Sequence, residues 1–286
     1  MLTETFRALV TATKRVFSNW QSLLLVALVY AALLGLLYLF VSIREATLAQ
    51  VTLTFAFAVA VPLLFFILQA MIVSGGARQV AREGGGATDQ APARFVLRRS
   101  LTSFWKLILI SLPLIALAIL IAYLLGKAQN RFGQTPEAIN NIPRTLAATA
   151  NPQRAARPID WRVALFSTLR YLAFGLFLPL LTIHLWLATV HDGLGGAIRR
   201  IASLLSRAFA PQSVLIYIAG FMIFAVVPYF LLFKTTQTAH AWLELFLLVA
   251  RLVIVFVLTL FGWVITVRAL GLSSATPPAQ PANEAA

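Results

Sequence analysis

The chain has 286 residues, of which 60% are hydrophobic and 11% are charged, and it contains no cysteine. Average soluble domains have about 45–50% apolar and about 25% charged residues, so this composition excludes an ordinary soluble protein. The lack of cysteine excludes disulfides, thiolate metal sites and a cysteine nucleophile. The formal charge of +14 would favour nucleic-acid binding only in a soluble chain, and no nucleic-acid partner is expected here.

Several apolar stretches are each long enough to cross the roughly 30 Å hydrocarbon layer of a bilayer as an α-helix. They lie at residues 22–42, 51–74, 106–125, 163–190, 213–233 and 242–267. Alternating apolar and polar segments of the kind that a membrane β-barrel needs do not occur between them, so we predict an all-α integral membrane protein with six transmembrane helices. Kinks are predicted at the prolines within these spans, Pro62, Pro113, Pro179 and Pro228.

A basic amphipathic segment precedes the first, third and fifth spans. The apolar stripe of these segments consists of Phe6, Leu9, Val10, Phe17 and Trp20, then Leu97, Leu101, Phe104 and Ile108, then Ile198, Ile201, Leu205 and Ala208. An apolar stripe, a basic face and an aromatic residue at the junction are what an interfacial helix needs. We therefore predict contacts with anionic phospholipid headgroups from Lys14, Arg15, Trp20, Arg98, Arg99, Trp105, Arg199, Arg200 and Arg207. The alternative is that these segments are only basic loops that flank the spans.

Parts of the sequence recur. The stretch RVFSNWQSLLLV at 15–26 returns as RAFAPQSVLIY at 207–217, and LTSFWKLILIS at 101–111 keeps the aromatic pair and the apolar onset. The spans within 61–78 and 178–199 share Pro-Leu-Leu and a Gly-Gly exit. We predict three parallel repeats, each an interfacial amphipathic helix plus a helical hairpin, at about 5–78, 92–192 and 194–270 of a single domain over residues 1–270.

The distribution of charge predicts an orientation. More lysines and arginines fall on the side that holds the N-terminus than on the opposite side, where most lie in one long external loop, 126–162. The positive-inside rule then places both termini in the cytoplasm. The first apolar run is too long for the apolar region of a signal peptide, so we expect an uncleaved anchor. Turns at 82–94 and 191–196 are expected to end helices, and the tail 271–286 is expected to be disordered.

This pattern resembles a broad group of bacterial six-span inner-membrane proteins, namely those similar to the membrane domain fused to some glycerophosphodiester phosphodiesterases, and related families. The resemblance rests on a basic helix, an aromatic elbow and a span at 17–25, 104–110 and 209–215, and on the Pro-Leu-Leu spans. It covers most of residues 5–270 and implies a multi-pass protein of the bacterial inner membrane. The sequence contains no soluble phosphodiesterase domain, so the resemblance implies no substrate.

Two arginines lie within predicted spans. A charge at the bilayer centre costs at least about 2.5 kcal/mol, so Arg170 and Arg251 need an explanation. The two guanidinium groups could together hold a lipid phosphate or another anion. Alternatively, each arginine extends toward the membrane surface or pairs internally, as Arg251 could with Glu244 two helical turns earlier. Arg170, Arg251 and Glu244 are therefore the candidate ligand-binding residues.

The sequence offers little for catalysis. His184 and His191 lack the i, i+4 spacing of a helical metal site, and we predict no metal and no cofactor. Paired carboxylates and the motifs GxSxG and HExxH are missing, so we do not expect an enzyme. Gln69, Ser111, Thr182 and Thr236 lie in or near spans and are predicted to form hydrogen bonds between helices.

The leading hypothesis is a non-enzymatic integral membrane protein, a membrane scaffold or partner-binding component whose interfacial helices contact lipid. The alternative is a transporter or carrier of a lipid or small amphiphile, with Arg170 and Arg251 facing a cavity. A lipid-modifying enzyme is a third hypothesis, which the missing acid and base groups disfavour.

Overall fold

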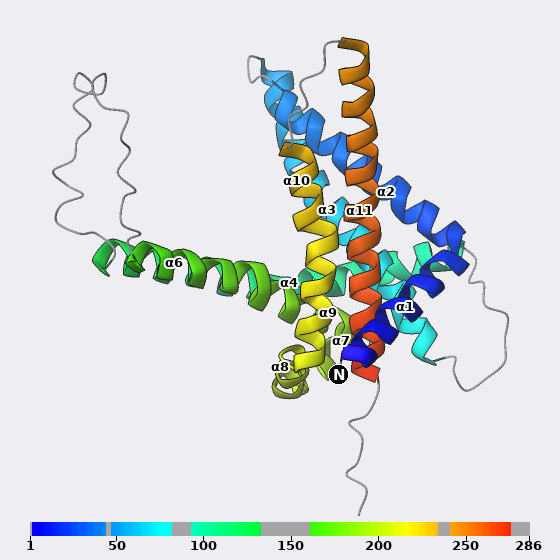
Figure 1. Cartoon of the computed structure of the whole chain (residues 1–286), viewed down its shortest axis with the longest axis vertical. Helices are drawn as coiled ribbons and strands as arrows, with labels where there is room; N and C mark the ends of the chain where they lie inside the picture. The colour runs from blue at the N-terminus through cyan, green and yellow to red at the C-terminus, as the bar shows by residue number, and fades with distance from the viewer. Residues whose placement is uncertain (1, 44–46, 82–92, 133–160, 234–240, 276–286) are drawn as a thin grey trace, which may run out of the picture. The chain divides into compact units, whose positions relative to one another are not determined.

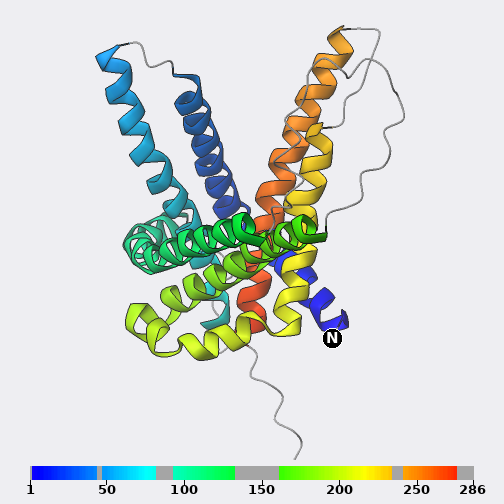
Figure 2. The same ribbon diagram turned by 90° about the vertical axis from the view of Figure 1, so that its left-hand side faces the viewer.

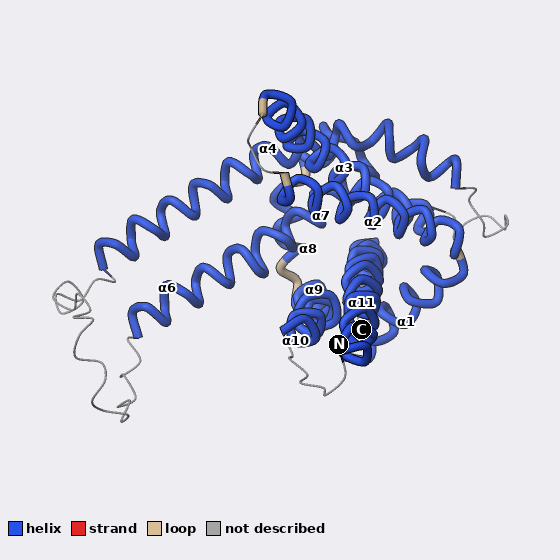
Figure 3. Tube along the Cα trace, turned by 90° about the horizontal axis from the view of Figure 1, so that it is seen from above, coloured by secondary structure: helices blue, strands red, loops and turns tan. Residues whose placement is uncertain are grey.

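The computed structural model describes residues 2–43, 47–81, 93–132, 161–233 and 241–275. These residues are almost entirely helical, and no strand occurs among them (Figure 3). Within them, six helices are long and apolar enough to cross a membrane: Trp20–Ser42, Leu48–Gly75, Leu97–Phe132, Ala164–Arg199, Pro211–Phe233 and Trp242–Ser273. The prediction of an all-α chain with six candidate spans is therefore confirmed.

The helices are labelled in chain order in Figure 1. They are α1 Leu2–Ser18, α2 Trp20–Ser42, α3 Leu48–Ala81, α4 Ala93–Phe132, α6 Trp161–Leu172, α7 Leu178–Arg199, α8 Ile201–Ala208, α9 Pro211–Phe221, α10 Val227–Phe233 and α11 Ala241–Ala275. Two π-helical segments, η1 Ala173–Phe177 and η2 Met222–Val226, join α6 to α7 and α9 to α10.

The chain forms two compact units. One consists of Met1–Ile110 with Leu180–Ala286, and the other consists of Ser111–Pro179. The single domain predicted over 1–270 stays a prediction, and the boundaries of the two units do not coincide with those of the predicted repeats. The threefold repeat therefore stays a prediction. The second unit, made of the C-terminal part of α4 with α6 and η1, exposes large apolar side chains such as Ile119, Tyr123 and Tyr171.

The core of the first unit lies where the N-terminal half of α7 meets the C-terminal halves of α3 and α11. The ring of Phe66 on α3 lies 6.4 Å from that of Trp186 on α7. At the next residue of α7, Cδ2 of Leu187 lies 3.4 Å from the place that a Cβ at Gly271 of α11 would occupy. Figure 2 shows α3 and α11 approaching each other toward their C-terminal ends and separated at their N-terminal ends. Accordingly, Phe55 near the start of α3 is 70% exposed, whereas Met71 near its end is 1% exposed.

Each of the two π segments lies next to one of the four prolines at which kinks were predicted. Pro179 and Pro228 each follow a π segment by two residues. A proline lacks an N–H group, and its ring collides with the carbonyl group four residues earlier. Those earlier residues are Gly175 and Phe224, which lie inside η1 and η2, so the wider turns fall where the proline disrupts regular α-helix. Pro62 and Pro113, in contrast, lie inside α3 and α4.

Only two of the three predicted elbows are breaks between helices. Asn19 separates α1 from α2, and the extended Ala210 precedes Pro211, which begins α9. A residue before proline is driven out of the helical conformation, which explains the second break. The expected elbow near Phe104 was wrong, because Ala93–Phe132 is one continuous helix. That stretch has no proline, glycine or asparagine near Phe104 to interrupt it.

Other predicted boundaries are corrected or confirmed in part. The turn at 191–196 is confirmed by Gly193, whose φ of 74° interrupts the helical path of α7. The tail was expected to be disordered from residue 271, but α11 continues to Ala275, since the first prolines come only at Pro277 and Pro278. The predicted loop 126–162 is helical at both ends, up to Phe132 and from Trp161. The rest of that loop, most of the turn 82–94 and residues 276–286 lie outside the described residues.

Candidate lipid-facing helices and a buried arginine

Helix α1 presents a small-residue face to the protein and a large apolar face outward. Thr5, Ala12 and Val16 are buried, and α1 packs against α11 and α9. Phe6 and Val10 lie about a third of a turn away and are 69% and 50% exposed. The predicted apolar stripe of α1 is thus mostly on the outside of the protein rather than in its core.

The same relationship holds in α4 and α8. Within the predicted amphipathic part of α4 the buried side chains are Ser100, Ser103 and Leu107, whereas the predicted stripe residues Leu97 and Leu101 are exposed. In α8 the buried side chains are Leu204 and Ala208, and Ile201 and Leu205 of the predicted stripe are exposed. Of the predicted stripe in α8, Ala208 alone packs inward. The exposed stripes need a cover that the described residues do not provide.

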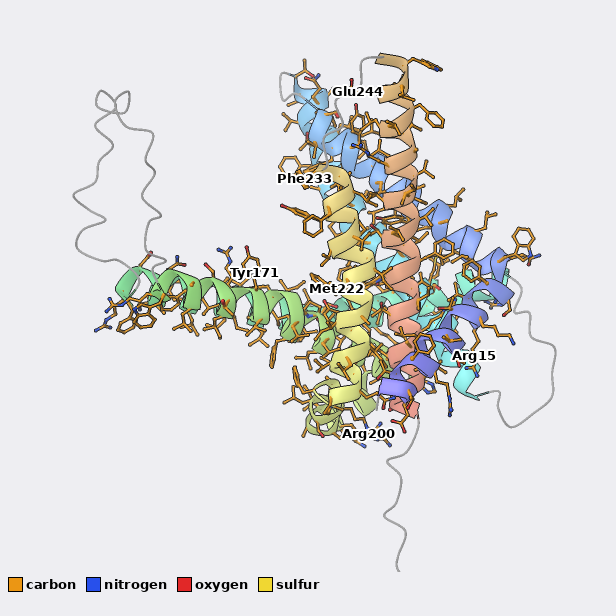
Figure 4. The ribbon with its side chains drawn as sticks, in the orientation of Figure 1. Arg15, Tyr171, Arg200, Met222, Phe233 and Glu244 are labelled. Atoms are coloured by element: carbon orange, nitrogen blue, oxygen red, sulfur yellow. The ribbon has the colours of Figure 1, made fainter. Side chains whose placement is uncertain are left out.

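Most of the cations and tryptophans predicted to contact lipid headgroups lie at the surface. The exposed ones are Lys14, Trp20, Arg98, Trp105, Arg199, Arg200 and Arg207, and the half-buried ones are Arg15 and Arg99. Arg200, labelled in Figure 4, donates a hydrogen bond to Asp192 across 3.2 Å. Their contact with lipid stays a prediction.

The paired-arginine hypothesis also stays a prediction. Arg170 lies exposed on α6 in the unit Ser111–Pro179. Arg251 and Glu244, the latter labelled in Figure 4, lie on α11 in the other unit, where Arg251 is half-buried and Glu244 is exposed. The two arginines thus belong to separate units.

Polar side chains are buried in the core of the first unit. The indole Nε1 of Trp263 on α11 donates a hydrogen bond of 2.9 Å to Oε1 of Gln69 on α3, which confirms that Gln69 bonds between helices. Thr266 instead donates to the carbonyl of Gly262 in its own helix. His184 lies 2% exposed in α7, with Nδ1 2.9 Å from the carbonyl oxygen of Leu180. Of the other predicted groups, Thr236 lies outside the described residues.

Arg268 is the functional candidate that the sequence did not reveal. The sequence counted it as one more cation near the end of the last span. In the structure it is 5% exposed, and a Cβ at Gly75 of α3 would lie 3.0 Å from its Nη2. Nε of Arg268 and Oγ of Ser74, the residue before Gly75 in α3, are buried without a hydrogen-bond partner among the described residues. One feature of the sequence could have indicated it, because Arg268 is the single charged residue in the apolar run 252–270.

Metal-ligating side chains do not gather in the part of the chain that the structure describes. No group of three His, Cys, Asp or Glu side chains comes together there. The described helices characterise the chain as an all-helical, multi-span protein of the membrane type. Comparisons with protein-family models, with curated proteins and with solved structures found no match.

Proposed function

We propose that the protein is a non-enzymatic integral membrane protein of the bacterial inner membrane that acts as a membrane scaffold or partner-binding component. Its interfacial helices hold it to the anionic cytoplasmic leaflet, and both termini face the cytoplasm. The observation that carries this proposal is the division of α1 between a buried face, Thr5, Ala12 and Val16, and an exposed face with Phe6 and Val10.

The two faces of α1 suit two different neighbours. The small buried side chains allow close packing on α11 and α9, as is usual between membrane helices. The exposed Phe6 and Val10 would each gain about 1.5–3 kcal/mol on full burial in the acyl region. A helix with this layout is stabilised in the plane of the interface.

The charges of α1 fit the same position. Arg7 and Lys14 are exposed and follow the apolar face around the helix. A cation close to an anionic leaflet contributes about 1 kcal/mol, and salt screens this contribution. Apolar and cationic faces that adjoin in this way support contact with an anionic lipid surface.

The test measures which lipids stay with the purified protein. We would compare the wild type with an Arg7→Gln, Lys14→Gln variant after solubilisation from membranes of mixed phosphatidylglycerol and phosphatidylethanolamine. The matched control is Lys127→Gln, Arg131→Gln. It removes two exposed cations near the C-terminal end of α4 that are not among the predicted headgroup contacts. The proposal predicts a lower retained fraction of phosphatidylglycerol in the first variant only. Equal retention in all three proteins would refute it.

A further inference from the structure

We propose that Arg268 is the centre of a buried anion site that binds a phosphate group, carried either by a lipid headgroup or by free phosphate, at the C-terminal ends of α3 and α11. The site is independent of the interfacial helices, because it rests on a different observation. That observation is an arginine, Arg268, that is 5% exposed and whose guanidinium forms no hydrogen bond or ion pair to a described residue.

A buried cation without a counter-charge is costly. Buried charges in proteins are paired, bound to a ligand or neutralised, and guanidinium cannot be deprotonated under ordinary conditions. A permanently charged group that the fold encloses therefore calls for a negative partner.

The acidic residues that the structure describes do not supply that partner. Asp192 forms an ion pair with Arg200, eight residues later in the sequence. Glu244 lies near the opposite end of α11, 24 residues before Arg268, which corresponds to about 36 Å along a helix. Glu4, the remaining described acid, is on the exposed part of α1.

Arg268 and the segment of α3 that it contacts carry donors suited to a phosphate. Gly75 leaves the space that Nη2 of Arg268 occupies, since a Cβ there would be only 3.0 Å away. Ser74, the preceding residue, has a buried hydroxyl without a partner among the described residues. A guanidinium and a hydroxyl match an acceptor-only oxyanion, which guanidinium groups often bind in a bidentate manner.

The depth of the site favours the same ligand. The candidate spans that carry these residues end at Gly75 and Ser273, so Arg268 lies within the last turns of its span. Membrane spans end at the level of the lipid phosphates, where arginine side chains meet them.

The experiment uses the full-length purified protein and two separate probes. Short-chain phosphatidylglycerol and inorganic phosphate are each titrated into the wild type, Arg268→Gln, Arg268→Lys and the control Arg131→Gln, and the thermal midpoint and the bound ligand are measured. Arg131 is exposed and is not among the predicted headgroup contacts. We expect stabilisation of the wild type and of Arg131→Gln, and binding at least roughly tenfold weaker in Arg268→Gln, since hydrogen bonds to charged groups are lost. Stabilisation by the lipid alone identifies a headgroup, and stabilisation by both probes identifies free phosphate as a sufficient ligand.

Two further variants keep the test decisive if Arg268→Gln does not fold. Gly75→Ala crowds Nη2 without removing the charge, and Ser74→Ala removes the second donor. Each should weaken phosphate binding several-fold, whereas Gly35→Ala, which has open space around it, should not. The proposal is overturned if neither probe binds the wild type, or if all variants bind equally. It is also overturned if a Glu83→Gln, Asp89→Asn, Glu284→Gln variant reproduces the loss of stability of Arg268→Gln without any ligand effect, because the counter-charge would then come from the chain itself.

Discussion

Helix α2 is one candidate membrane span, and α6, η1 and α7 together hold another, Ala164–Arg199, yet the two spans have different surroundings. In the most apolar stretch of Trp20–Ser42, 6% is buried inside the protein, whereas 50% is buried in the most apolar stretch of Ala164–Arg199. The buried span has the lower mean hydropathy of the two. In a membrane protein the most apolar helix can therefore face lipid, while the protein interior holds the more polar one.

The reason lies in what the bilayer tolerates. A buried histidine and threonine, His184 and Thr189, sit within the stretch 180–189 of α7, whose residues are buried almost all round. Thr189 donates to the carbonyl of Leu185, and His184 contacts that of Leu180. Both carbonyls belong to α7 itself, and the helices packed around this stretch keep its polar side chains away from lipid.

The largest expected effect comes from cutting back the core of α7. Leu180→Ala removes a side chain that is 0% exposed and should destabilise the protein by about 2–5 kcal/mol, because it leaves a cavity. Leu28→Ala on α2, where the side chain is 63% exposed, should cost below about 0.5 kcal/mol. Reversible unfolding in lipid bicelles would measure both. Similar losses at the two positions would mean that α2 is covered by protein.

A second comparison uses two glycines. A Cβ at Gly220 of α9 would collide with the side chain of Thr266 on α11, so Gly220→Ala should destabilise the α9–α11 contact by about 1–3 kcal/mol. Gly35→Ala on α2 meets open space and should be neutral, or stabilising by up to about 1 kcal/mol. The same unfolding assay distinguishes them, and a neutral Gly220→Ala contradicts the close packing.

The hydrogen bond between α3 and α11 should have a smaller effect. Trp263→Phe keeps the aromatic ring and leaves the buried Oε1 of Gln69 without its donor, at a cost of about 1–2 kcal/mol. Trp105→Phe alters an indole that is 59% exposed and serves as the control. If Gln69→Leu combined with Trp263→Phe restores the lost stability, the unsatisfied oxygen is the cause. A cost that persists in the double variant points to packing instead.

The smallest effect is expected at the surface ion pair. Arg200, 68% exposed in its side chain, pairs with Asp192, and Arg200→Gln should cost below about 1 kcal/mol. The difference from the wild type should vanish in high salt, because exposed charges are screened. A salt-independent loss would show that Arg200 does more than pair at the surface.

Hydropathy alone predicted the six candidate spans, because a run of apolar residues needs no tertiary partner to be recognised. The breaks at Asn19 and Ala210 also followed from local sequence, and the missing break near Phe104 shows that an aromatic pair cannot end a helix. The sequence did not predict which face of α1 is buried, since the large apolar Phe6 is exposed while the smaller Ala12 and Val16 are buried. In a membrane, small residues pack against helices and large ones can face lipid.

The candidate anion site was beyond sequence reasoning for a related reason. Arg268 and Gly75 are distant in the chain, and only the packing of α11 on α3 brings them together. Gln69 could be predicted as an interhelical group because it is polar within a span, but Trp263 could not be named as its donor. Which side chains meet between two helices depends on how each helix is rotated about its own axis. An apolar run in the sequence does not determine that rotation.

The central claim is that lipid covers the exposed apolar face of α1. Because the chain contains no cysteine, this claim can be tested directly with single labelled cysteines. Single cysteines replace Val10 on the exposed apolar face and Ser18 on the exposed polar face, and each carries a nitrobenzoxadiazole label in vesicles that contain phosphatidylglycerol. Reduction of the label by dithionite in the surrounding water is then timed. The account predicts slow reduction at position 10 and fast reduction at position 18, because lipid covers only the first. Equal rates at the two positions would contradict it.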